Sequence, residues 1–261
     1  MKAALAQTHI FWEDKKLNFD KVNSFVGQAK KKTADIVLFP EMSLTGFSMN
    51  IKVTAEDDSQ DTVEKTKELC RKDNIAIGLG WTKRGDGKAE NHYTVIDRNG
   101  KICSDYVKIH PFSYAGETDF FQGGKEIRYF EMGGYTWSTF ICYDLRFPEI
   151  FQVASEKADI LVVPANWPEK REDHWRTLLK ARAIETQSYV LGINCVGMVG
   201  NISYSGYTSA YSPDGICLNE LVNEEGLVLV ELNHEELEIR KSFPVKKDRK
   251  WKFYSEKYIE M

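Results

Sequence analysis

Two segments of this chain repeat one local pattern, and the repeat constrains the fold more than any other feature. The first reads ADIVLFPE at residues 34–41, and the second reads ADILVVPAN at residues 158–166. Each is followed by a stretch with helical spacing and then by an apolar run containing glycine, IAIGLGW in the first case and YVLGINCVG in the second. The shared Ala-Asp opening and the matched proline favour duplication of a strand–helix–strand unit over chance similarity between two buried strands. Such units pack as mixed sheets with helices outside.

Hydrophobic periodicity predicts the other elements. A hairpin turn is expected at Asn99–Gly100, and the tail from Glu235 is expected to be helical at first and then irregular. No linker rich in glycine, proline or serine interrupts the chain, so we expect a single α/β domain over residues 1–261. The predicted strands are residues 3–6, 36–39, 75–79, 93–96, 102–106, 136–142, 160–163, 189–194, 208–211 and 227–231, and the predicted helices are residues 19–32, 62–72, 148–157 and 174–186.

The charge balance argues against nucleic acid and membrane partners. The net charge is −4 over 261 residues, which creates no field that attracts polyanions. The lysine-rich stretches at residues 30–32 and 246–250 are more simply explained as solvated helix ends and loops. The opening MKAALAQTHI lacks the continuous apolar region of a secretory signal, and no run approaches 18 apolar residues. A cytoplasmic location is therefore the default expectation.

The cysteines do not form a recognisable disulfide or zinc pattern. There are five of them, widely spaced, with no Cys-x-x-Cys pair and no His-Glu-x-x-His motif. We therefore expect no metal site, and we expect most of these thiols to behave as small buried hydrophobic groups.

Three predicted strands end in residues that carry chemistry. Cys142 closes the apolar run WSTFIC and precedes a turn into a helix, a position where a thiol is exposed and the next backbone N–H faces a developing oxyanion. Glu41 follows the first repeated strand directly after Pro40. Lys108 follows the strand ending in Asp-Tyr-Val and lies between two apolar residues, which indicates partial burial. Each of these residues alone is more simply explained as a structural thiol, a cap or a solvated charge.

Taken together, the three contexts resemble a known family. FPEMSLTGF around Glu41, YVKIHPF around Lys108 and FICYDLRFPE around Cys142 are similar to the Glu-Lys-Cys signature of the nitrilase, or carbon–nitrogen hydrolase, superfamily. The resemblance continues through PANWP, ARAIETQSYV, YSGYTSAYSPDG and FPVKKDR, so it covers nearly the whole chain. CYDLRFPE looks like the amidase branches that act on ω-amides of keto acids.

The resemblance implies an α-β-β-α sandwich that pairs through its helices into a homodimer or a larger homo-oligomer, and it implies no cofactor. It also implies a second glutamate between the lysine and the cysteine. Glu117 fits best by its offset from the aromatic-glycine element FFQGG, with Asp119 and Glu126 as competitors.

The chemistry of these groups predicts a thioester mechanism. Cys142 would attack an amide carbonyl, with Glu41 as the general base and Glu117 as support for Lys108. The Lys108 ammonium and the Tyr143 backbone N–H would stabilise the oxyanion. Candidate substrate-binding residues are Arg146 and Arg171 for a distal carboxylate, and Phe47, Tyr114 and Trp167 for the walls.

Several alternatives stay open at this point. The chain could be a Cys–His hydrolase that uses His110 or His174, or a binding protein that kept the fold and lost catalysis. Within the resemblance, N-carbamoyl amines and deaminated glutathione are alternative substrates. Arg146 could instead form a structural ion pair with Asp144 or Glu149.

Overall fold

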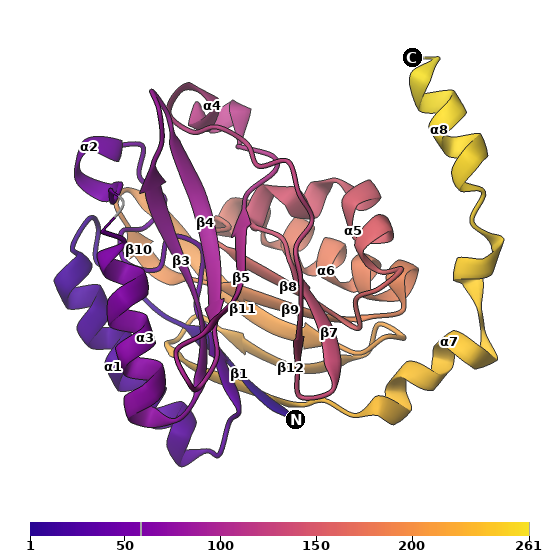
Figure 1. Cartoon of the computed structure of the whole chain (residues 1–261), viewed down its shortest axis with the longest axis horizontal. Coiled ribbons are helices and arrows are strands. Elements are labelled where there is room, and N and C mark those ends of the chain that lie inside the picture. The colour runs from indigo at the N-terminus through magenta and orange to yellow at the C-terminus, as the bar shows by residue number, and fades with distance from the viewer. Residues whose placement is uncertain (58, 261) are drawn as a thin grey trace.

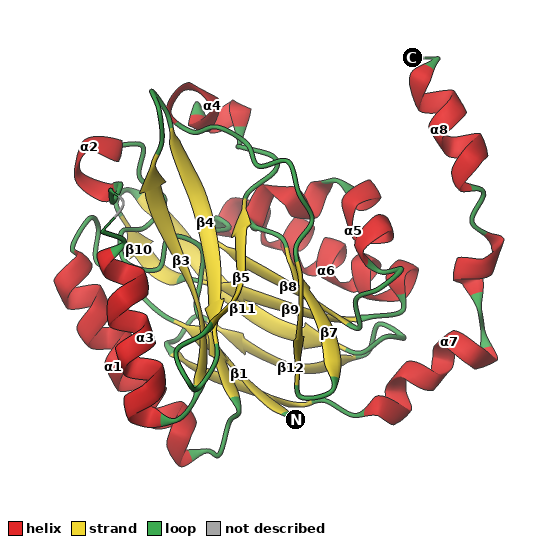
Figure 2. Ribbon diagram, in the orientation of Figure 1, coloured by secondary structure: helices red, strands yellow, loops and turns green. Residues whose placement is uncertain are grey.

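Two mixed β-sheets pack face to face, and helices cover the outer face of each (Figures 1 and 2). The computed structural model describes residues 1–57 and 59–260. The first sheet has the order β13-β1-β2-β3-β4-β5, and the second has the order β10-β11-β9-β8-β7-β6 with β12 paired to β11. This arrangement confirms the expected α/β sandwich with two mixed sheets.

The bounds of the elements are as follows. The first sheet consists of β1 (Lys2–Gln7), β2 (Ile36–Leu38), β3 (Ala76–Arg84), β4 (Ala89–Ile96), β5 (Ile102–Val107) and β13 (Gly226–Glu231). The second consists of β6 (Tyr129–Met132), β7 (Tyr135–Thr139), β8 (Ile160–Ala165), β9 (Tyr189–Asn194), β10 (Val196–Val199), β11 (Ile202–Tyr211) and β12 (Cys217–Val222). The α-helices are α1 (Lys15–Lys31), α2 (Ile51–Thr54), α3 (Asp61–Asp73), α4 (Glu117–Phe120), α5 (Pro148–Ala154), α6 (Glu172–Thr186), α7 (Ile239–Ser242) and α8 (Trp251–Ile259).

The repeated sequence segments form equivalent parts of the two sheets. Strands β1, β2 and β3 run parallel in one sheet, and β7, β8 and β9 run parallel in the other. The aspartate that opens each repeat makes the same contact, because Asp35 accepts a hydrogen bond from the Lys2 backbone N–H at 2.8 Å and Asp159 accepts one from Thr136 N–H at 3.0 Å. The matched contacts explain the shared Ala-Asp opening and support the predicted duplication.

Helix α1 shows how the outer layers form. Val22, Phe25, Val26 and Ala29 recur at helical spacing and bury one face against the first sheet. The helix begins four residues before the predicted start, because Asp14 caps it by accepting from Leu17 N–H and the first turn is polar. The largest core lies between the two sheets and includes Leu5, Tyr93, Trp137, Phe140 and Leu161.

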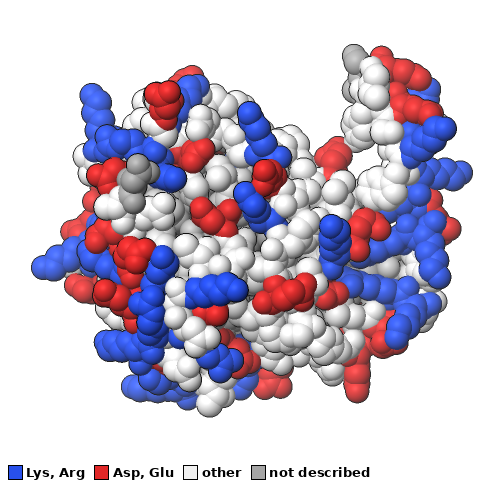
Figure 3. Space-filling view, in the orientation of Figure 1, with Lys and Arg blue, Asp and Glu red and all other residues white. Residues whose placement is uncertain are grey.

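The C-terminal prediction was wrong. Instead of becoming irregular, the tail ends in helix α8, none of whose residues is buried, and Figure 1 shows it projecting as an arm from the body. Basic side chains gather along this arm (Figure 3), and three of them anchor it. Arg240 donates to Gln187 O and Ala158 O, Arg249 donates to Gln152 O and Glu185 O, and Lys246 donates to Ser155 O. These cations therefore cover the carbonyl-rich ends of α5 and α6.

The short strands β6, β10 and β12 were also missed in the sequence, because their exposed or half-exposed residues give no clear alternation. Over the described residues, no helix is both long enough and apolar enough to cross a membrane.

Candidate active site

A buried ammonium joins two buried carboxylates at one edge of the sandwich. Lys108 Nζ lies 2.9 Å from Glu41 Oε1 and 2.8 Å and 3.1 Å from the two carboxylate oxygens of Glu117. All three side chains are at most 1% exposed. The ammonium therefore makes three hydrogen bonds to the two carboxylates, and Lys108 also lines the cavity described below.

Close backbone packing fixes Glu41 after strand β2. A Cβ on Gly80 of β3 would lie 2.4 Å from Met42 N and 2.8 Å from Pro40 O, so only glycine lets β3 approach this turn. The Asn166 backbone N–H donates to Glu41 Oε2 at 3.0 Å, and the Asn166 side-chain amide donates to the Glu41 carbonyl oxygen at 2.6 Å. Residues from both sheets thus hold the carboxylate.

The two other charged residues also have backbone anchors. Lys108 follows β5, and its N–H donates to Asn91 O at 2.9 Å. Glu117 opens the short helix α4, and its carboxylate accepts from the Phe112 N–H. Of the three candidates for the second glutamate, Glu117 is buried beside Lys108, whereas Asp119 and Glu126 are exposed.

Cys142 lies three residues beyond β7 and opens a 3₁₀ turn over Cys142–Arg146. Its φ of +48° is in the left-handed region, a strained conformation for a non-glycine residue. Asp144 fixes this turn from inside, because its buried carboxylate accepts from Ile141 N–H at 2.9 Å, from the Tyr106 hydroxyl at 2.7 Å and from His110 N–H at 2.9 Å. The first hydrogen bond of the turn runs from Asp144 N–H to Ile141 O, so the Tyr143 N–H precedes the bonded part of the turn.

The pKa shifts define the resting protonation of the site. Burial, together with the nearby Glu41 carboxylate, raises the pKa of the Cys142 thiol well above its ordinary value. Burial opposes the charge on Lys108, but Glu117 and Glu41 outweigh it and raise the pKa of the ammonium. Burial also raises the pKa of Glu117, against the lowering effect of Lys108. The resting site therefore holds a neutral thiol beside a permanent cation, and a base must remove the thiol proton during attack.

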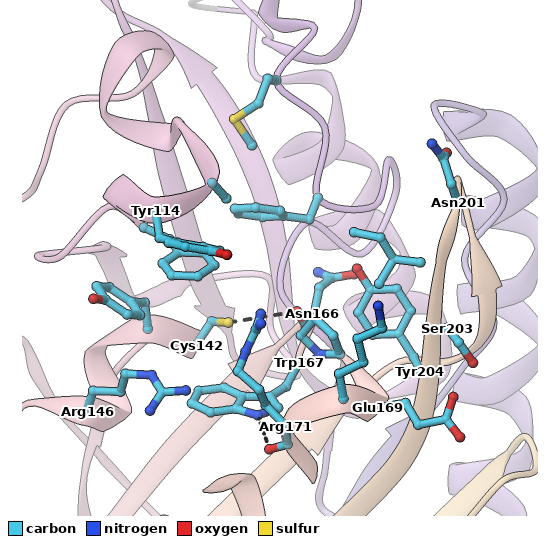
Figure 4. Close-up of a pocket in the computed structure, with 18 of the residues that line it drawn as sticks. Tyr114, Cys142, Arg146, Asn166, Trp167, Glu169, Arg171, Asn201, Ser203 and Tyr204 are labelled. Atoms are coloured by element: carbon cyan, nitrogen blue, oxygen red, sulfur yellow. Dashed lines mark hydrogen bonds between the residues drawn. The ribbon is translucent and has the colours of Figure 1, made fainter.

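A cavity of about 500 Å³ opens onto Cys142 and Lys108 (Figure 4). All five predicted substrate-binding residues line it: Phe47, Tyr114, Arg146, Trp167 and Arg171. Tyr114 is 86% exposed and therefore lies at the rim. Ser203 and Tyr204 of β11 line the same cavity but were not among the predicted substrate-binding residues, although Tyr204 opens the segment YSGYTSAYSPDG.

The guanidinium groups of Arg146 and Arg171 line this cavity. Arg146 lies over the Trp167 ring at 4.7 Å, and Arg171 lies 5.6 Å from the Phe112 ring centroid. Burial and the neighbouring Arg171 lower the pKa of Arg146. Across the described part of the chain, neither guanidinium forms an ion pair with a carboxylate, so the suggested pairs of Arg146 with Asp144 or Glu149 are not formed.

The histidines do not form a Cys–His pair with the thiol. His110 hydrogen-bonds Asp144 at 2.8 Å and stacks on Phe147, and His174 Nδ1 lies 3.3 Å from Arg146. Among the described residues, the side chains that polarise Cys142 are Glu41, Lys108 and Glu117. The geometry thus favours the Glu-Lys-Cys arrangement over the Cys–His alternative.

A sandwich of two mixed sheets with a thiol, an ammonium and two carboxylates at one cavity defines a class of thiol hydrolase. Residues 2–240 match the carbon-nitrogen hydrolase family, and the chain belongs to that family. It is 34% identical to the 2-oxoglutaramate amidase of Bacillus subtilis over 232 residues, which cover 87% of this chain and 89% of that protein. It is 30% identical to the omega-amidase YafV of Escherichia coli K12 over 254 residues, which cover 95% and 96% of the two chains.

A solved structure agrees with the fold. A CN-hydrolase superfamily protein from Xanthomonas campestris, crystallised with an arsenic adduct in its active site, superimposes with a TM-score of 0.89 at 28% identity. The match covers 95% of this chain and 97% of that one.

Proposed function

We propose that this chain is an amidase that hydrolyses the terminal amide of a short dicarboxylate monoamide, such as 2-oxoglutaramate, to a carboxylate and ammonia. The observation that carries the proposal is the pair of guanidinium groups, Arg146 and Arg171, in the same cavity as the Cys142 thiol. The relatives named for 2-oxoglutaramate and ω-amides support the substrate class.

Acylation begins with attack of the Cys142 sulfur on the amide carbonyl carbon. The thiol proton passes to Glu41, because the raised pKa of the thiol keeps it protonated until attack. The new oxyanion is stabilised by the Lys108 ammonium and by a hydrogen bond from the Tyr143 backbone N–H. Glu41 then gives its proton to the departing nitrogen, the C–N bond breaks, and ammonia leaves a thioester on Cys142.

Deacylation uses the same groups in the same order. Glu41, again a carboxylate, takes a proton from a water molecule while the water oxygen attacks the thioester carbon. The C–S bond breaks, the proton returns from Glu41 to sulfur, and the acid product leaves. Glu117 keeps Lys108 in place through bonds of 2.8 Å and 3.1 Å, so the cation stabilises both oxyanions from one position.

The two arginines supply recognition of the distal carboxylate. A guanidinium binds a carboxylate through two parallel charge-assisted hydrogen bonds, which fixes distance and orientation together. A carboxylate substrate would neutralise cations that repel each other in the free site, as the lowered pKa of Arg146 indicates. Phe47 and Trp167 supply apolar walls of the same cavity.

Of the alternatives, a catalytically silent binding protein has no need for a neutral thiol kept beside a carboxylate and an ammonium. N-carbamoyl amines and deaminated glutathione are amides for which the named relatives supply no support. These compounds belong in the substrate panel as competitors.

We further propose a homodimer with a cytoplasmic location. The C-terminal arm leaves several large apolar side chains in solvent, and a second copy of the chain could cover them; they are Phe243, Trp251, Phe253, Tyr254, Tyr258 and Ile259. Sedimentation should show twice the 30.0 kDa mass of the chain at micromolar concentration. A monomer at that concentration would contradict the assembly.

The test of the reaction is ammonia release from a substrate panel. 2-Oxoglutaramate and the corresponding four-carbon amide should give the highest kcat/KM, above N-carbamoyl amines and neutral amides. A preference for an N-carbamoyl amine would overturn the substrate while leaving the thiol mechanism intact. No turnover with any amide, from a protein whose Cys142 reacts with a thiol reagent, would overturn the enzyme assignment.

A further inference from the structure

One buried side-chain amide donates to both carboxylates beside the thiol. Asn91 lies on β4 and is 1% exposed. Its Nδ2 donates to Glu41 Oε1 at 2.8 Å and to Glu117 Oε1 at 3.3 Å. Its backbone oxygen accepts from the Lys108 N–H at 2.9 Å. A single residue therefore contacts both carboxylates and the lysine that joins them.

The donors around Glu41 leave one oxygen available to the thiol. Oε1 accepts from both Lys108 and Asn91, which uses the two acceptor positions of that oxygen. Oε2 accepts only from the Asn166 backbone N–H among the described residues, so it keeps a lone pair for the Cys142 proton. Without the Asn91 amide, the carboxylate could rotate to satisfy Oε1 in another way and take Oε2 away from sulfur.

The Oδ1 end of the Asn91 amide lowers the stability of the folded protein. Asn91 Oδ1 is buried and has no hydrogen-bond donor in the described structure. A buried acceptor without a partner destabilises a protein, so such a group calls for another explanation. The Nδ2 end of the amide provides that explanation. It is a neutral donor to two carboxylates that share a single ammonium, that of Lys108.

We infer that Asn91 is a positioning residue, which holds the Glu41 carboxylate so that its Oε2 is left for the Cys142 thiol; this rests on the role of Glu41 as general base in the proposed function. A base accepts a proton only when its free lone pair faces the donor, so removal of the Asn91 amide should slow every step in which Glu41 takes the thiol proton.

The test compares Asn91→Leu, which is close in shape but has no donor, with Asn91→Asp, which places a third carboxylate at the same point. Each variant is measured from pH 5 to 9 by kcat/KM with 2-oxoglutaramate and by the rate at which iodoacetamide alkylates Cys142, read from the mass of the Cys142 peptide. Alkylation transfers the thiol proton to Glu41, forms an S–C bond and releases iodide, so it reports on the base without an amide substrate. It therefore tests Asn91 even if the substrate assignment fails.

We expect Asn91→Leu to lower kcat/KM at neutral pH by about tenfold or more, a part of what a general base contributes. Alkylation of Cys142 should slow by about the same factor, because it needs the same transfer of the thiol proton to Glu41. For Asn91→Asp the defect should grow with pH, because the added carboxyl can donate a hydrogen bond only while protonated.

The matched control is Asn18→Leu. Asn18 is a buried amide that donates to Phe11 O and Leu44 O away from the cavity, both at 2.7 Å. The Asn18→Leu protein should lose stability without a change in kcat/KM or in the rate of Cys142 alkylation. A folded Asn91→Leu protein whose Cys142 is alkylated at the wild-type rate would overturn the inference. If Asn91→Leu does not fold, Asn91→Asp decides, and a defect that does not vary with pH contradicts the proposal.

Discussion

Asn166 and Glu41 hold each other across the two sheets, with the Asn166 N–H on Glu41 Oε2 at 3.0 Å and its side-chain amide on the Glu41 carbonyl at 2.6 Å. Both residues follow the proline of a repeated segment, one after β2 and the other after β8. The duplication therefore brings equivalent strand ends together, and the site forms where the two halves meet. Cys195 extends the contact, since its thiol lies 3.3 Å from Asn166 Oδ1.

Replacement of the proposed nucleophile should remove activity without unfolding the protein. Cys142→Ala should lower kcat by several powers of ten, because a nucleophile and its base act as a unit. Ammonia release and the thermal unfolding midpoint are the measurements. Cys70→Ala, at a buried thiol outside the cavity, should cost roughly 1 kcal/mol of stability and leave turnover unchanged. Near-normal turnover by a folded Cys142→Ala protein would exclude the thioester route.

The sequence predicted the charged part of the site because those residues lie within distinctive local contexts. Glu41 and Lys108 follow apolar runs, Cys142 ends one, and Glu117 precedes the aromatic-glycine element FFQGG; the fold brings the four together. Asn91 has no such context, because in ENHYTVI it reads as one polar residue of an alternating strand. Its importance depends on a contact 50 positions away in sequence, which local pattern does not encode.

The C-terminal arm was missed for a related physical reason. In the segment WKFYSEKYI, aromatic and charged residues alternate around the whole helix, so the sequence gives no one-sided apolar face. A helix with no buried residue leaves no periodic signal of burial. The two-sheet core, by contrast, is predicted by continuous apolar runs in the sequence, such as ILVVPA of β8, every residue of which is buried.

Gly80 should be required for the geometry of Glu41. In Gly80→Ala the new methyl group would lie 2.4 Å from Met42 N, and backbone there cannot yield without moving Glu41. We expect a loss of about 1–3 kcal/mol in unfolding free energy and a fall in kcat of about tenfold or more, since small misplacements of catalytic groups are costly. Denaturant unfolding and ammonia release measure the two effects.

Gly27 of α1 is the control for this substitution. A Cβ there meets nothing within 4 Å, so Gly27→Ala should stabilise the protein by about 0.5–1 kcal/mol and leave kcat unchanged. Equal effects at the two positions would show that the loss at Gly80 reflects glycine in general and not its contact with the Glu41 turn.

The anchor of the C-terminal arm should make stability depend on pH. Burial, together with Arg240 and Arg249, lowers the pKa of Lys246 from 10.5 to about 7. Between these values the unfolded chain binds more protons than the folded one, so stability rises with pH from about 7 to 10.5. The cost of the buried charge is fully present below pH 7 and is relieved as the folded lysine loses its proton.

Lys246→Met removes the cost of burying the lysine charge, and with it the pH dependence of stability that Lys246 causes. Compared with the wild type, the variant should gain unfolding free energy at pH 6 by roughly 1–3 kcal/mol more than at pH 10, a range that allows for partial solvent screening. Urea unfolding at the two pH values is the measurement, and the exposed neighbour Lys247→Met serves as control. A stability difference that stays constant from pH 6 to 10 would contradict the lowered pKa.

The arginine pair should determine the preference for a substrate with a free carboxylate. For the wild type, kcat/KM for 2-oxoglutaramate should exceed that for a neutral amide of the same length by about 2–4 kcal/mol of transition-state binding, because the neutral amide leaves a cation without its partner. In Arg146→Met and Arg171→Met the discrimination should shrink, and in the double variant it should nearly vanish. The neutral amide acts as the internal control: its kcat/KM should change little, since the thiol, Glu41 and Lys108 are untouched.

A residue that merely supports the cavity would lower kcat/KM for the two amides equally. If the ratio of the two kcat/KM values stays unchanged in both single variants and in the double variant, the arginines have no part in substrate recognition. A fall confined to one variant would assign the carboxylate to that guanidinium alone.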